Sequence, residues 1–100
     1  MPSYRLTEPA LEDLVALAVF IARDHPGTAD RITDEIESAL GGLAEMPGKG
    51  HSRHDLTAGP TLLFWSVRHF LIVYRAESKP LEVLRILHGS RDATKELKPR

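Results

Sequence analysis

The spacing of apolar residues predicts a helix near the start of the chain. Between Glu8 and Asp24, apolar residues recur at steps of three and four positions, which places them on one face of a helix. Thr7 offers a capping hydroxyl, Glu8 an acidic first-turn residue and Pro9 a first-turn proline, so we expect the helix to begin there. The residues expected on its buried face are Leu11, Leu14, Val15, Ala18, Ile21 and Ala22.

A second helix is expected directly after the first. Pro26 and Gly27 are expected to end the first helix, and Thr28 to cap the second. Pro47 and Gly48 are expected to stop it. Because the connection is so short, the two helices should be antiparallel neighbours. The apolar face of the second helix is expected to contain Ala29, Ile32, Ile36, Ala39, Leu40 and Leu43.

Three apolar runs of strand length follow a Gly- and Pro-rich loop over residues 47–60. They cover residues 62–67, 70–75 and 81–88, and the two-residue gap between the first two predicts a tight hairpin. With a short extended segment at residues 3–6, the order is β-α-α-β-β-β. This order predicts an α+β fold in which an N-terminal helical hairpin packs on a mainly antiparallel sheet. At 100 residues, the chain has room for a single domain, 1–100.

The strand from Phe70 to Tyr74 is almost continuously apolar, which suggests that both faces of the sheet are covered. One sheet face of so small a domain cannot hide every apolar strand residue. We therefore expect the strand residues to form, with the helical hairpin, an exposed apolar groove that a partner fills.

Charge is distributed unevenly along the chain. Residues 1–46 carry three basic and nine acidic side chains, a net of −6, and residues 47–100 carry ten basic and five acidic side chains, a net of +5. The overall pI near 6.5 is not that of a general nucleic-acid binder. The absence of cysteine, of a signal-peptide pattern and of a bilayer-length apolar run predicts a soluble cytoplasmic protein without membrane contact.

Three segments resemble the ParE/RelE superfamily of toxins from type II toxin–antitoxin systems, and they are more similar to its ParE-like branch. They are Tyr4–Thr7 with Ala10 and Asp13-Leu14, Leu63–Arg75, and Leu84–Asp92, and together they span nearly the whole domain. The most specific parts are the run Ile-Val-Tyr-Arg, which ends at Arg75, and the run Ile-Leu-His-Gly, which is followed by Arg91 and Asp92.

The resemblance implies a β-α-α-β-β-β toxin that a small cognate antitoxin neutralises by wrapping around it. Operator DNA would be bound only through the antitoxin. The ParE branch implies that DNA gyrase is the target, whereas the RelE branch implies an mRNA interferase that cleaves mRNA on the ribosome. A third alternative is an inactive homologue that only binds an antitoxin. No cofactor is implied.

If the chain is a nuclease, its candidate catalytic residues are His88, Arg75 and Arg85. Nuclease members of the superfamily carry a histidine acting as general acid or base where His88 ends the last strand, a role suited to a pKa near neutrality. Arginines on these strands bind phosphate in that branch. Unless the last strand contains a bulge, however, Arg85 and His88 lie on opposite faces. Arg85 would share a face with Val83 and Leu87, and His88 with Leu84 and Ile86.

The C-terminal tail carries the residues that we expect to bind the target: Arg91, Asp92, Lys95 and Lys98. The tail lacks the Tyr or Phe that nucleases of the superfamily commonly use to stack on a base, which disfavours RNA cleavage. His51 and His54, with only Asp55 beside them, fall short of a metal-ligand set, so no metal site is expected. The leading hypothesis is a gyrase-binding toxin without catalytic chemistry.

Overall fold

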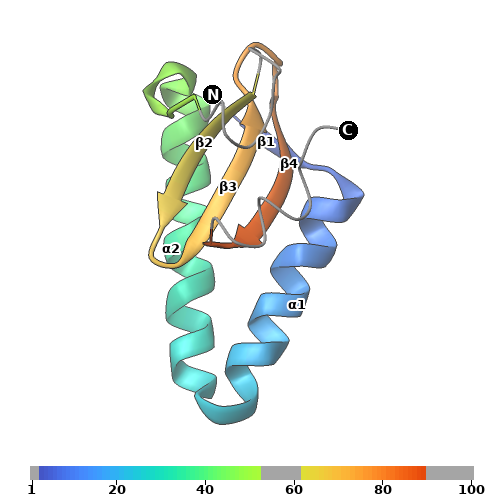
Figure 1. Cartoon of the computed structure of the whole chain (residues 1–100), viewed down its shortest axis with the longest axis vertical. Helices are drawn as coiled ribbons and strands as arrows, with labels where there is room; N and C mark the ends of the chain where they lie inside the picture. Colours follow the sequence, from blue (N-terminus) through green and yellow to red (C-terminus); the bar gives the residue numbers. More distant parts are fainter. Residues whose placement is uncertain (1–2, 53–61, 90–100) are drawn as a thin grey trace.

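The computed structural model describes residues 3–52 and 62–89, which form two helices, a short 3-10 turn and one sheet (Figure 1). Neither helix combines the length and the apolar character needed to cross a bilayer, as far as the described residues go. The elements are β1 (Tyr4–Leu6), α1 (Glu8–Asp24), α2 (Pro26–Glu45), η1 (Pro47–Lys49), β2 (Leu62–Val67), β3 (Phe70–Arg75) and β4 (Leu81–His88).

The sheet has the order β1-β4-β3-β2. β1 runs parallel to β4, while β4 with β3 and β3 with β2 are antiparallel. The helical hairpin covers one face of this sheet (Figure 1). The α+β fold and the β-α-α-β-β-β order are thus confirmed, and so are the bounds expected for α1, β2, β3 and β4. The Thr7 hydroxyl accepts the Ala10 N–H at 3.3 Å and caps α1, as its position predicts.

The second helix begins three residues earlier than the sequence pattern predicts. α2 starts at Pro26, its N-cap is His25, and Thr28 does not cap it. The His25 N–H closes the last turn of α1 on the Ile21 carbonyl, and the His25 carbonyl accepts the Ala29 N–H in the first turn of α2. The sequence pattern predicts that Pro26 ends the first helix, but a proline at the first helical position loses no hydrogen bond and has a helical φ, so Pro26 begins α2.

A tight turn, Arg68-His69, joins β2 to β3. Arg68 has a φ of 55°, a left-handed conformation that is uncommon outside glycine. Its guanidinium donates to both carboxylate oxygens of Glu35 on α2, at 2.7 and 2.8 Å. These hydrogen bonds are the main reason that the pKa of Glu35 lies below its ordinary value. The hairpin is therefore tied to the helical layer by an exposed ion pair.

The main core lies between the helices and the sheet, and its centre is fully buried. The buried residues on the helices are Ala10, Ile32, Ile36, Leu40 and Leu43, and those on the strands are Phe70, Ile72, Tyr74, Leu81, Val83 and Ile86. A second cluster, formed by Phe64, Leu71, Val73 and Leu87, comes from the alternate strand positions and hence from the other sheet face.

The expectation of an exposed apolar groove is wrong for β3, although the end of β4 borders a groove with α1. Every residue from Phe70 to Tyr74 is buried, because β3 is a central strand and both of its faces are covered. The exposed apolar surface instead belongs to α1. Leu11, Val15 and Ala22, expected to be buried, are exposed, since the face that packs inward is formed by Ala10, Leu14, Leu17 and Ile21.

Candidate functional site

The end of β4 borders a groove that α1 forms with the sheet. His88, the last residue of β4, is exposed, and its ring lies 5.3 Å from the Phe70 ring. The groove has a volume of about 610 Å³. It is lined by Asp13, Ala16, Leu17, Phe20 and Ile21 of α1, Ile32 of α2, His69 and Phe70 at the hairpin, and Arg85 to His88 of β4.

β4 contains a bulge, which changes the expected alternation of its side chains. Val73 pairs with Arg85 and Tyr74 pairs with Val83, so Leu84 has no partner on β3. Val83 and Ile86, three positions apart, consequently lie in the same core cluster. The sequence pattern predicts that Val83 and Arg85 share one face of the strand and that Leu84 and Ile86 share the other. This prediction is wrong, because the bulge puts Val83 on the same face as Ile86.

The bulge lies before Arg85, so Arg85 and His88 still point to opposite sides of the strand. Both nevertheless border the groove, because β1 pairs only with Leu81 to Val83 and leaves the following edge of β4 open. The Arg85 side chain reaches α1 across this open edge. Strand alternation alone therefore does not separate the two side chains.

Asp13 of α1 engages the open edge of β4 and neutralises Arg85. The Arg85 Nε donates to one Asp13 oxygen at 2.7 Å, and a terminal nitrogen donates to the other at 3.0 Å. The Ile86 N–H donates to Asp13 at 2.9 Å. Both charged side chains are mostly buried, with 27% of Arg85 and 17% of Asp13 exposed. One carboxylate thus satisfies an edge amide and binds a guanidinium in a bidentate geometry.

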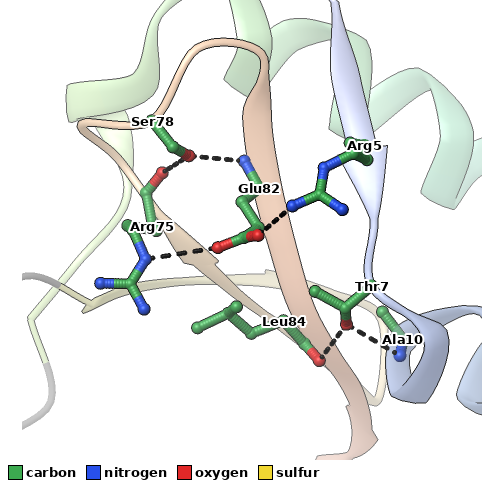
Figure 2. A network of polar contacts seen from close by, with 7 residues as sticks. All are labelled: Arg5, Thr7, Ala10, Arg75, Ser78, Glu82 and Leu84. Atoms are coloured by element: carbon green, nitrogen blue, oxygen red, sulfur yellow. Dashed lines mark hydrogen bonds and ion pairs between the residues drawn. The ribbon is translucent and has the colours of Figure 1, made fainter.

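Thr7 fastens the start of α1 to the same strand, nearly two turns before Asp13. Its N–H donates to the Val83 carbonyl at 3.0 Å, and its hydroxyl donates to the Leu84 carbonyl at 3.0 Å (Figure 2). The sequence pattern predicts Thr7 as a cap but does not predict the contacts that Thr7 and Asp13 make with β4. The available signal was Asp13 itself, an acidic residue beside Ala10, Leu14 and Leu17 on the inward side of the helix.

Arg75 lies at the opposite end of the sheet from His88 and is also engaged by a carboxylate. Its Nε lies 3.4 Å from Glu82, whose other oxygen accepts from Arg5 of β1, so that Glu82 sits between two arginines (Figure 2). The Glu82 N–H donates to the Ser78 hydroxyl at 2.8 Å, which donates to the Arg75 carbonyl at 3.0 Å. The structure does not bring Arg75 together with His88.

Some of the remaining candidates lie among the described residues and others lie outside them. Arg91, Asp92, Lys95 and Lys98 lie outside the described residues, as does His54. His51 pairs through its backbone with Phe64, and its ring stacks on Trp65 with centroids 5.9 Å apart. Residues 3–52 and 62–89 contain no cluster of three or more potential metal ligands.

The ParE toxin family of the type II toxin–antitoxin system parDE matches residues 4–93 of the chain. The chain belongs to the ParE toxin family. No curated protein matches it at a significant level. Among solved structures, it is similar to a chain of the chromosomal ParDE toxin–antitoxin system from P. aeruginosa, with a TM-score of 0.73 and 22% sequence identity. The similarity covers 89% of this chain and 97% of that chain, and at this identity it supports the fold.

In this member of the ParE family, a buried tyrosine fastens the segment after α2 to the sheet. The Tyr74 hydroxyl donates to the Pro47 carbonyl and accepts the Gly50 N–H at 3.0 Å. A Cβ at position 50 would collide with this hydroxyl and lie 2.9 Å from its ring carbon Cζ, so the position requires glycine. Burial raises the pKa of Tyr74 above its ordinary value, and the hydrogen bond from Gly50 opposes part of that rise.

Replacing Tyr74 by Phe is expected to lower the free energy of unfolding by about 1–2 kcal/mol, because two partly buried backbone groups lose their partner. A tyrosine whose pKa is raised by folding stabilises the protein below pH 10 and loses this contribution as the pH rises further. The variant should therefore lose less stability than the parent between about pH 9 and 11. Urea denaturation across this range measures both effects.

Tyr4→Phe is the matched control for this prediction. The Tyr4 hydroxyl makes no hydrogen bond to any described residue, although burial and, to a lesser degree, the Glu37 carboxylate raise its pKa. We expect the control to change the unfolding free energy at neutral pH by under about 0.5 kcal/mol. Equal losses in the two variants at neutral pH would show that the Tyr74 hydrogen bonds do not stabilise the fold.

Proposed function

We propose that the chain is a ParE-type toxin that inhibits DNA gyrase by binding it, without catalytic chemistry of its own. Membership of the ParE family supports the class of protein. The observation that carries the mechanism is the pairing of both candidate strand arginines with carboxylates: Arg85 with Asp13, and Arg75 with Glu82. This pairing favours a structural role for each arginine.

Cleavage of RNA demands more than these side chains offer. A nuclease site combines a general acid and base with cations that stabilise the charge developing on phosphate. To bind phosphate, Arg85 would have to give up two hydrogen bonds to Asp13, and Arg75 lies at the other end of the sheet. A toxin that acts by binding needs only an accessible surface of defined shape. The basic tail positions Arg91, Lys95 and Lys98 are our candidates for this contact.

A ribosome-dependent mRNA interferase is the second candidate, and one observation favours it. His88 and Arg85 border the same groove, so an acid–base group and a cation lie near one another. An RNA phosphate entering the groove would have to displace Asp13 from Arg85. We rank this function second because the Asp13 carboxylate, which is paired with Arg85, would also repel a phosphate.

A cognate antitoxin is the proposed partner in the cytoplasm, and it would link the toxin to operator DNA. The chain offers it less free charge than the sequence predicts, because two arginines of the basic half pair with carboxylates of the acidic half. Arg68 binds Glu35 and Arg85 binds Asp13, both across the division at residue 46. Hydrophobic anchors are therefore expected to dominate the affinity of the antitoxin, and charge to affect mainly its association rate.

We expect the purified chain to inhibit supercoiling of relaxed plasmid DNA by gyrase, and His88→Ala to inhibit it within about twofold of the parent. The exposed His88 ring lies against Phe70 and makes no hydrogen bond to a described residue, so its removal should leave the fold intact. Supercoiling assays with purified gyrase measure the effect, and cleavage of ribosome-bound mRNA is assayed in parallel.

The antitoxin-bound toxin provides the control in both assays, since neutralisation should restore gyrase activity. Cleavage of mRNA by the parent that disappears in His88→Ala, with gyrase unaffected, would replace the gyrase proposal by the interferase. A chain inert in both assays would correspond to an inactive antitoxin-binding homologue.

A further inference from the structure

Four apolar side chains are buried on the face of the sheet that lies opposite the helices. Phe64, Leu71, Val73 and Leu87 form this cluster, which we call the outer patch. Their exposed fractions are 1%, 4%, 0% and 4%. α1 and α2 cover the other face (Figure 1), and no described helix or strand packs over the outer patch. The described fold therefore does not account for the burial of these side chains.

The outer patch lies where the chain leaves the sheet. Leu87 is the last residue but one of β4, and it pairs with Leu71 of β3. At the other end of these two strands, the face becomes polar at the ion pair between Arg75 and Glu82 (Figure 2). Gly89 follows β4 with a φ of 72°, a conformation that glycine adopts without steric cost. The extended strand thus ends directly beside the patch.

The C-terminal tail, residues 90–100, is long enough to reach every part of the patch. The patch extends over three neighbouring strands, whose spacing of about 4.8 Å makes it about 10 Å wide. An extended chain advances about 3.3 Å per residue, so the eight residues from 90 to 97 can cross it. Leu97 is the only large aliphatic residue of the tail, whose other side chains are mostly charged or small.

We propose that the outer patch is the docking site of the C-terminal tail, and that Leu97 anchors the tail there. The patch is buried in a single copy of the chain, which argues against a second copy or a partner protein as its cover. Residues 53–61 precede Leu62, at the opposite end of β2 from the hairpin, whereas the row formed by Leu71 and Leu87 adjoins the start of the tail. This position favours the tail over the internal segment.

Docking through one apolar residue gives the tail a fixed position on the domain. Arg91, Lys95 and Lys98, which are the proposed target contacts, then remain attached to a rigid surface instead of to a free chain end. An anchored segment loses less conformational entropy when it binds a partner. The docking itself does not depend on the identity of that partner.

Proximity of the tail to the patch can be measured by cross-linking, because the chain contains no cysteine. Ser66 is exposed and pairs with Leu71, so a cysteine there lies beside the patch. The full-length double variant Ser66→Cys with Glu96→Cys should react rapidly with a short bifunctional thiol reagent. Adding Leu97→Ser should slow the intramolecular cross-link by about fivefold or more, because a released tail has a lower effective concentration at the patch.

Exposure of the patch provides a second measurement. Leu97→Ser should lower the melting temperature by about 4–8 °C, as expected for the loss of one buried leucine contact in a domain of this size. It should also increase the fluorescence of a dye that binds apolar surface. Leu97→Met conserves volume and apolar character, so it should restore most of the melting temperature. Leu56→Ser, in residues 53–61, is the matched control and should have the smaller effect.

Equal cross-linking rates with and without Leu97→Ser would overturn the proposal, and so would an unchanged melting temperature in Leu97→Ser. A larger loss of stability and more dye binding in Leu56→Ser would assign the cover of the patch to residues 53–61 instead. None of these measurements involves gyrase, so the docking site and the proposed function can fail separately.

Discussion

Asp13→Ala is expected to lower the free energy of unfolding by about 2–3 kcal/mol. The substitution removes the Asp13 carboxylate from the mostly buried Arg85 guanidinium and removes the acceptor of the Ile86 N–H. Breaking a fully buried ion pair costs about 3–5 kcal/mol, and the partial exposure of this pair reduces that figure. Urea denaturation measures the loss. Hydrogen exchange should also show faster exchange at Ile86, because this amide lies on the open edge of β4.

Two further substitutions separate the contributions at this site. Asp13→Asn keeps an oxygen that can accept from Ile86 but removes the charge, so it should recover part of the lost stability. Glu12→Ala is the control on the same helix, exposed and without an ion pair to any described residue, and should cost under about 0.5 kcal/mol. If Asp13→Ala and Glu12→Ala were equally mild, Asp13 would not be the contact that holds α1 on β4.

Replacing Arg91, Lys95 and Lys98 together by Ala is expected to reduce toxicity about 10- to 100-fold, measured as the inducer level needed to stop growth. The physical reason is the loss of three positive charges from the surface proposed to dock on the target, each contributing up to about 1 kcal/mol. His88→Ala should leave toxicity unchanged, because a binding mechanism needs no acid–base group at that position.

The charge-matched control for the tail variant replaces three other basic residues, Arg23, Arg31 and Lys79, together by Ala. These exposed residues form no ion pair with any described residue, so the control removes the same net charge from elsewhere. Thermal unfolding of both variants separates a lost contact from a lost fold. The tail assignment would be abandoned if the control variant lost as much toxicity as the tail variant. It would also be abandoned if the tail variant had a lower melting temperature as well as reduced toxicity. Loss of toxicity in His88→Ala alone, at an unchanged melting temperature, would favour catalysis.

Local patterns were sufficient for the elements and the fold class. The bounds of α1 and of β2, β3 and β4 follow from the apolar spacing, from the Thr7 cap and from the two-residue gap at Arg68. The family could also be recognised from local runs such as Ile72 to Arg75. These features depend on residues that are close in sequence, and so they can be read without knowing which elements meet.

Two errors came from residues whose effect depends on their exact position in an element. Pro26 can end one helix or begin the next, and only the hydrogen bonds of His25 show that it begins α2. The bulge at Leu84 leaves no composition signal, yet it reverses the side-chain pattern before Arg85. A single inserted residue changes which side chains share a face, because strand side chains alternate with a period of two.

The sequence by itself determined the order and type of the elements, the family and the acidic character of the helical layer. Only the tertiary structure decided which apolar residues are free and which charges are neutralised. α1 has apolar residues on most of its circumference, so its periodicity did not reveal that Leu11 and Val15 face solvent. Asp13 and Arg85 are 72 positions apart, and their pairing depends on how α1 crosses the open edge of β4. Contacts of this kind come from packing between distant segments, which no local pattern encodes.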